Sequence, residues 1–422
     1  MRQRIRSEPA PMALETAPRD PWRYRWVVLG VATFTQAAAG FFVQGIGSIG
    51  VQLQEGLGLS TAELGLLVSA AQLAPLAGLL VAGELLDRYH ERWVVGLGAG
   101  LVAVCLAAGG LAPGYPVLLA VLFFAGVGYS AVQPGGSKSV AAWFDTSRRG
   151  LAMGIRQAGL PLGAALASAV LPFLAEAYGW RSTLVAGGVV ALLGAGVFVG
   201  CYRRPPALPS PEAYPSPGAP HAAAPAASGR LRLLRSPAMV RIMLSGTSLI
   251  ATQYGVAVLT VLYLHEAAGL AVGPAALVLV AAQAAGVAGR ITLAAVSDRT
   301  ASGRYVTVAV CMVAVIAGMA VLLTPAGRSP ATAAAVLIWL GFFGYGWYGP
   351  WVAYVAESAP PGRTGFALGL AMAVNQVAII LVPPLLGLLK DTTGTFAPAW
   401  GLLIAMTAIA LLTTARPAAI RP

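Results

Sequence analysis

Charged residues, histidine and cysteine are all scarce in this sequence. Asp, Glu, Lys and Arg make up 10% of its 422 residues, whereas soluble globular domains average about 25%. The three cysteines, Cys105, Cys201 and Cys311, lie within or at the end of apolar segments and show no short-range spacing. Neither a disulfide framework nor a zinc site is therefore indicated. The three histidines form no cluster with cysteine or carboxylate. We expect no metal site, no cofactor and no enzymatic activity.

Long apolar runs dominate the chain instead. Hydrophobic residues make up 58% of the sequence, and its mean hydropathy is +0.76. A helix needs about 20 residues, at a rise of 1.5 Å each, to cross a hydrocarbon core of ~30 Å. Runs of this length lie near residues 26–50, 61–86, 94–112, 116–143, 150–175, 182–201, 239–264, 273–296, 305–325, 331–355, 365–389 and 398–414. The sequence thus predicts an all-α membrane protein with twelve transmembrane helices.

A proline-rich segment separates the first six runs from the last six. Proline at such density disfavours regular helix and favours an extended linker. The first run is longer than the apolar region of a signal peptide and is not followed by a cleavage site, so we interpret it as an uncleaved helix. The predicted organisation is an N-terminal tail (1–25), a six-helix bundle (26–201), a linker (202–237), a second six-helix bundle (238–414) and a C-terminal tail (415–422).

The net charge of +12 comes from 27 Lys and Arg residues against 15 Asp and Glu residues. Most of the basic residues fall in alternate loops, on the side of the two tails and the linker. This distribution follows the positive-inside rule and predicts that both termini are cytoplasmic. We therefore expect a multi-pass protein of a bacterial-type inner (plasma) membrane, whose partner is the lipid bilayer and not nucleic acid.

Two motifs recur in the two halves at nearly the same offset. Gly83-Glu84-Leu85-Leu86-Asp87-Arg88 ends the second run, and Ala295-Val296-Ser297-Asp298-Arg299 ends the eighth. Arg149-Gly150-Leu151-Ala152-Met153-Gly154 opens the fifth run, and Thr364-Gly365-Phe366-Ala367-Leu368-Gly369 opens the eleventh. Such a repeat favours a duplicated fold with two pseudo-symmetric halves.

The chain resembles the major facilitator superfamily of transporters over nearly its whole length. The family's loop between its second and third helices has the pattern G-x-x-x-D-R-x-G-R-R/K, which Gly83, Asp87, Arg88 and Arg92 match, whereas Tyr89-His90-Glu91 depart from it. Glu357-Ser358-Ala359-Pro360, leading to Arg363, also resembles the end of the family's tenth helix. The resemblance implies two six-helix bundles that expose a central site to each side of the membrane in turn.

The same resemblance implies a gate at the cytoplasmic ends of the helices. Asp87 is expected to face the start of the eleventh helix and Asp298 the start of the fifth, where the positive ends of the helix dipoles lie. The predicted gating residues are Asp87, Arg88, Arg92, Asp298, Arg299, Glu357 and Arg363. The alternative is that they are ordinary solvated loop charges.

Two arginines lie inside predicted membrane spans. Arg156 is about 9 Å and Arg290 about 12 Å from the nearest helix ends. An arginine at such depth costs on the order of 2.5–3.5 kcal/mol and usually faces a cavity or a partner, although a long side chain can also reach the interface. In the resembled fold the fifth and eighth helices meet, so the two guanidinium groups are expected to converge and to favour a carboxylate or a similar oxyanion.

Polar side chains at helical spacing indicate a polar cavity around these arginines. Each stripe of amides and phenols places its members on one face of a helix. The predicted substrate-binding residues are Arg156, Arg290, Gln157, Gln283, Tyr129, Gln133, Gln44, Tyr254, Asn375 and Tyr348. The alternative for any one of them is a packing role between helices.

All Asp and Glu residues lie in loops or near the ends of spans, which disfavours efflux of cationic drugs. The segment from Arg156 to Gly163 and the pair Gly289-Arg290 resemble the branch of the family that carries small anions such as oxalate, formate, cyanate and nitrate. We therefore predict a monomeric secondary transporter of a small organic anion of the monocarboxylate type, moved alone, in exchange, or with a proton. The alternatives are a multidrug or metabolite exporter of the same fold and a solute sensor.

Overall fold

The computed structural model describes residues 21–59, 61–205, 236–299 and 303–414. The predicted C-terminal tail, nearly all of the N-terminal tail and most of the proline-rich linker lie outside these residues.

The described chain is almost entirely helical. Its first half contains α1 (Pro21–Gly45), the 3-10 turn η1 (Ile46–Ile49), α2 (Gly50–Leu57), α3 (Thr61–Arg88), α4 (Glu91–Gly109), α5 (Tyr115–Trp143), α6 (Arg149–Tyr178) and α7 (Trp180–Cys201). Its second half contains α9 (Pro237–Glu266), α10 (Val272–Arg299), α11 (Arg304–Leu322), η2 (Pro325–Arg328), α12 (Pro330–Gly346), α13 (Tyr348–Ser358), α14 (Thr364–Thr393) and α15 (Ala397–Thr414). Within the described ranges, twelve helical segments are long and apolar enough to cross a membrane, which confirms the twelve predicted spans.

The tenth span differs from a single regular helix because it is broken between α12 and α13. Pro350 lies just after the break. Proline lacks a backbone N–H, and its ring clashes with the carbonyl group four residues earlier, here that of Gly346. At the break, the aromatic residues Trp347, Tyr348 and Trp351 pack against one another, with ring centroids 5.0 to 5.5 Å apart.

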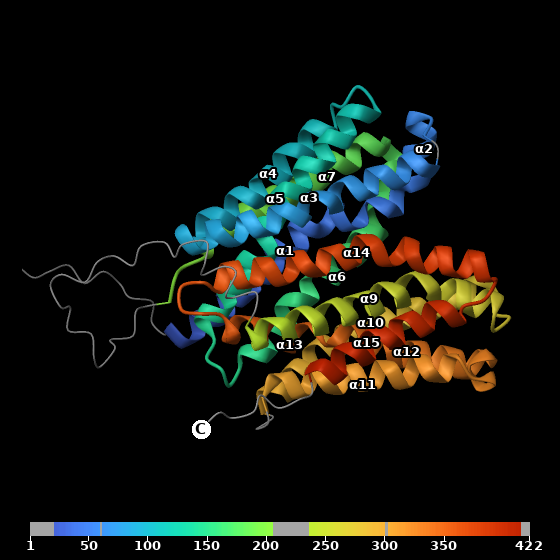
Figure 1. The fold of residues 1–422 in the computed structure, drawn as a ribbon. Coiled ribbons are helices and arrows are strands. Elements are labelled where there is room, and N and C mark those ends of the chain that lie inside the picture. The colour runs from blue at the N-terminus through green and yellow to red at the C-terminus, as the bar shows by residue number, and fades with distance from the viewer. Residues whose placement is uncertain (1–20, 60, 206–235, 300–302, 415–422) are drawn as a thin grey trace, which may run out of the picture.

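The two halves form separate helical layers that run side by side (Figure 1). They meet along two matching helix pairs, α3 with α14 and α6 with α10. These are the second and eleventh spans and the fifth and eighth spans, as a duplicated fold requires. We call the end where α7 stops and α9 starts the linker end, and the opposite end the far end. The layers converge toward the linker end and diverge toward the far end (Figure 1).

Glycines allow the two halves to touch backbone to backbone near the linker end. A Cβ atom at Gly154 would lie 2.3 Å from the carbonyl oxygen of Arg290, and one at Gly369 would lie 2.3 Å from that of Leu79. Real Cβ atoms do not approach backbone oxygens this closely. The closed arrangement therefore depends on glycine at these positions.

Replacing Gly154 by Val is expected to separate the halves at the linker end, because the added side chain meets the α10 backbone and not a flexible side chain. The measurement is the distance between spin labels at two exposed loop residues, Ser147 in the first half and Pro361 in the second, after replacement of the native cysteines. Gly100→Val is the matched control, since nothing lies within 4 Å of a Cβ there. An unchanged distance in the Gly154 variant would contradict the prediction.

Candidate functional site

Asp87 lies at the linker end of α3 and contacts the first turn of α14. Its two carboxylate oxygens accept hydrogen bonds from the backbone N–H groups of Gly365 and Phe366, each at 2.8 Å. The first N–H groups of a helix have no partner within the helix, and its dipole attracts negative charge. Lys138, at 3.2 Å from Oδ1 of Asp87, adds a second positive group. Asp87 therefore connects the two halves of the protein.

Asp298 makes the matching contact on the other side of the interface. Its carboxylate accepts hydrogen bonds from the backbone N–H groups of Gly150 and Leu151 at the start of α6, both at 2.7 Å. Arg304 lies between Asp298, at 2.6 Å, and Glu357, at 2.7 Å. Glu357 also pairs with Arg149 of the first half at 3.4 Å. The contacts predicted for both aspartates are present at the linker end.

The four remaining predicted gating residues divide into two kinds. Arg363 pairs with Glu84 across the halves at 3.4 Å, whereas Arg88 pairs with the same Glu84 within α3. Arg299 is exposed, and the guanidinium group of Arg92 packs over the ring of its neighbour Trp93. The structure thus places Arg363 in the interface, and Arg88, Arg92 and Arg299 beside it.

Sequence reasoning missed Lys138 and Arg304 as members of this network. Arg304 follows Asp298 in the chain much as Arg92 follows Asp87, and this repeated spacing could have indicated that Arg304 belongs to the network. Lys138 lies on α5, and no motif of the first half connects it with Asp87.

A small cavity of about 50 Å³ lies between the halves, deeper in the bundle than these contacts. Its volume is enough for a few water molecules. It is lined by Gln44, Gln72, Pro75, Leu79, Tyr129, Ser130, Gln133, Leu160, Ile250, Gln253, Tyr254, Arg290, Tyr348, Gln376 and Ile379. Six of the ten predicted substrate-binding residues are in this set: Gln44, Tyr129, Gln133, Tyr254, Arg290 and Tyr348.

Arg290 is the one cation in this lining. Its side chain is 3% exposed; Nε donates to the carbonyl oxygen of Tyr345 at 3.2 Å and Nη1 to that of Gln157 at 2.7 Å. The guanidinium carbon lies 5.6 Å from the centre of the Tyr348 ring. No carboxylate in the described chain lies within ion-pairing distance of it. The positive charge is held in place by neutral groups and is not compensated by a fixed acid.

Arg156 is not in the lining of this cavity, although Tyr129 and Tyr348 of the lining interact electrostatically with both guanidinium groups. Its Nη2 donates to the carbonyl oxygens of Val132 and Gln133 on α5, at 3.1 and 2.6 Å. The side chain is completely buried, and its Nε and Nη1 atoms have no hydrogen-bond partner. The carbonyl groups of α5 hold it behind the wall to which Gln133 belongs.

Gln157, Gln283 and Asn375 also lie outside the cavity lining. Gln157 is buried and accepts a hydrogen bond from Gln36. Asn375 is buried without a side-chain hydrogen bond, and Gln283 is exposed on α10. The lining includes Gln72, which sequence reasoning did not single out, although a lone amide within an apolar run was a signal for it.

Polar contacts across the cavity join the two halves. Gln376 of α14 donates to the carbonyl oxygen of Gln72 on α3 at 2.9 Å, and Gln133 of α5 donates to the hydroxyl group of Tyr348 on α13 at 3.1 Å. Together with the bond from Arg290 to Gln157, they surround a space with one cation, several amides and several phenols. A solute held there would contact both halves at once. Two helical halves with membrane-spanning helices and a polar cavity between them are typical of a solute transporter.

Comparison with known proteins identifies the family. The model of the Major Facilitator Superfamily matches residues 32–383, so the chain belongs to this superfamily. A Mycobacterium tuberculosis protein described as an MFS-type transporter is 27% identical over 91% of this chain and 84% of its own length. The probable galactarate/D-glucarate transporter of Bacillus subtilis is 26% identical over 82% of this chain and 81% of its own length.

A solved structure supports the same fold. The crystal structure of the MFS transporter FucP in the outward conformation superposes with a TM-score of 0.74, at 16% identity, and covers 94% of this chain and 99% of that chain. At this identity the likeness concerns the fold alone.

Proposed function

We propose that the protein transports a small organic anion of the monocarboxylate type. The observation that carries this proposal is the guanidinium group of Arg290, a fixed cation in the cavity lining with no carboxylate partner in the described chain. A buried charge needs a counter-charge, and an anionic solute would provide it. The lining itself contains one cation, Arg290, which matches a single negative charge.

The cargo of one relative supports the chemical class. The B. subtilis relative carries the name of a probable transporter of galactarate and D-glucarate, which are dicarboxylates, so it supports organic anions as a class and not the restriction to monocarboxylates. Within this class, the predicted resemblance to the oxalate/formate and cyanate/nitrate-like branch remains our narrower proposal.

The positive-inside distribution supports a placement with the linker end in the cytoplasm of a bacterial-type inner membrane. In the proposed mechanism, solute enters from the far end and binds across the halves, and the contacts of Asp87 and Asp298 then break so that the linker end opens. The lining contains no carboxylate to hold a proton. A coupled proton would therefore travel on the solute, and exchange or uniport is also compatible with the site. We propose that a monomer suffices, because each chain encloses its own cavity.

Counterflow into proteoliposomes tests this function. Vesicles preloaded with one unlabelled acid are supplied with the same labelled acid, in a panel of lactate, formate, 4-hydroxybenzoate, oxalate and galactarate. We expect accumulation of at least one monocarboxylate, and weaker or no accumulation of the dicarboxylates. Accumulation of organic cations alone would support the exporter alternative, and binding without accumulation would support the sensor alternative.

A further inference from the structure

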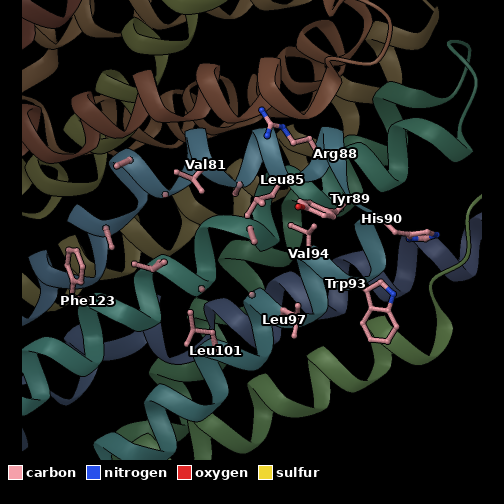
Figure 2. Close-up of a pocket in the computed structure, with 18 residues that line it drawn as sticks. Val81, Leu85, Arg88, Tyr89, His90, Trp93, Val94, Leu97, Leu101 and Phe123 are labelled. Atoms are coloured by element: carbon pink, nitrogen blue, oxygen red, sulfur yellow. The ribbon is translucent and has the colours of Figure 1, made fainter. Parts of the chain in front are cut away.

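The outer face of the first bundle carries a large apolar groove (Figure 2). It lies over α3, α4 and α5 and has a volume of about 1010 Å³. Its lining includes the small residues Gly98 and Gly128, where α4 and α5 pack closely: a Cβ at Gly98 would lie 2.7 Å from the carbonyl oxygen of Gly128. Val81 and Leu97 form its walls and are 59% and 70% exposed. The groove faces away from the partner bundle and therefore toward the hydrocarbon of the bilayer.

The length of the groove suits one leaflet. Its lining on α3 runs from Ala74 to Arg88, which corresponds to about 21 Å of helix. Half of the hydrocarbon core measures about 15 Å. An acyl chain of one leaflet can thus lie along the groove while its headgroup remains beside Arg88.

Positive and aromatic side chains are gathered at the linker end of the groove. Arg88, Tyr89, His90 and Trp93 all line this end, and Figure 2 shows them spread over the side of the groove away from Phe123 and Leu101. The side chain of Arg88 is 58% exposed. Tyrosine and tryptophan prefer the headgroup level of a membrane. The groove therefore ends where a phospholipid headgroup would lie.

The charges at this end favour an anionic headgroup. Two of the nearby carboxylates point inward: Asp87 binds the start of α14, and Glu91 is 7% exposed and pairs with Lys138 and Arg204. Burial, and to a lesser extent the nearby Arg204, lower the pKa of His90, which disfavours its charged form. Arg88 pairs with Glu84 of the same helix at 3.4 Å, but Glu84 also pairs with Arg363, and the Arg88 side chain is 58% exposed against 20% for that of Glu84. The Arg92 guanidinium lies over the Trp93 ring beside it.

A second groove of about 850 Å³ has the same design on the other bundle. It is lined by α11 and α12 and ends at Arg241 and Tyr305, with the guanidinium carbon 5.7 Å from the ring centre. A basic and aromatic end to an apolar groove therefore occurs in both halves.

From these observations we propose that the groove over α3, α4 and α5 is a binding site for an anionic phospholipid of the surrounding bilayer, with one acyl chain along Val81 and Leu97 and its phosphate at Arg88. This site is separate from the central cavity and does not depend on the identity of the transported solute.

Native mass spectrometry of the purified full-length protein tests the proposal. The protein is equilibrated with equal amounts of phosphatidylglycerol and phosphatidylcholine in mild detergent, and the retained lipids are counted. We expect the wild type to retain phosphatidylglycerol preferentially and Arg88→Gln to lower that preference about five-fold. Arg299→Gln is the matched control, because Arg299 occupies the repeated position at the end of α10 and lines no described groove. Equal retention of both lipids by the wild type, or an equal loss in the Arg299 variant, would overturn the proposal.

A second variant tests the acyl-chain part of the site. Val81→Trp fills the groove and keeps Arg88, and we expect it to reduce the retention of both lipids. Val189→Trp on α7 is its control, since Val189 is similarly exposed, at 53%, and lines no described groove. If Val81→Trp retained both lipids at the wild-type level, the groove would not hold the chain.

Discussion

Replacement of Arg290 by Gln is expected to abolish solute binding and counterflow, with a loss of at least about 100-fold. A hydrogen bond to a charged group contributes about 1.5–3 kcal/mol, and a carboxylate can receive two such bonds from a guanidinium group. The glutamine side chain keeps the polarity of the position and removes its charge. The measurement is binding of the best solute from the counterflow panel, followed by counterflow of the same solute.

Two further variants distinguish the effect of the Arg290 charge from the effect of its side-chain shape and from any effect on folding. Arg290→Lys keeps the charge but loses the planar fork, so we expect an intermediate loss. Thr292→Val changes an exposed residue of the same helix and is expected to behave as the wild type. Wild-type counterflow in a monodisperse Arg290→Gln protein would show that the guanidinium group does not bind the cargo.

The double replacement Asp87→Asn and Asp298→Asn is expected to open the linker end. Each aspartate accepts two backbone hydrogen bonds at the N-terminus of a helix of the other half, at 2.7 to 2.8 Å. Loss of the charge at a helix N-terminus costs up to about 2 kcal/mol in partly buried geometry. Two such losses, up to about 4 kcal/mol together, shift the equilibrium between closed and open forms by up to about 1,000-fold.

The spin-label pair at Ser147 and Pro361 measures this shift as a longer distance distribution. Each single variant is expected to produce a smaller change than the double variant, because the remaining aspartate still joins the halves. Asp391→Asn removes an exposed carboxylate at the far end, 75% exposed, and is expected to leave the distribution unchanged. If the double variant kept the short distances of the closed form, these contacts would not control the gate.

The sequence alone determined the membrane spans and the duplication of the two halves. A span must contain about 20 apolar residues because a bilayer leaves the backbone no other hydrogen-bond partners, so hydropathy is nearly sufficient to find it. The resemblance to the superfamily, supported by the repeat of Asp87 in Asp298 and of Gly150 in Gly365, implied the contacts at the linker end. The repeat by itself does not say which helix each carboxylate faces.

The membership of the cavity was decided by the tertiary structure. Arg156 and Arg290 have similar depths in the sequence, yet carbonyl groups of α5 hold one behind the wall while the other lines the cavity. Gln283 shares a helical face with Arg290 but lies about 10 Å closer to the far end, where the layers diverge (Figure 1). Periodicity gives the face of a helix, whereas the tilt of one half against the other, and the acceptors that a neighbouring helix offers, decide which side chains of that face reach the solute.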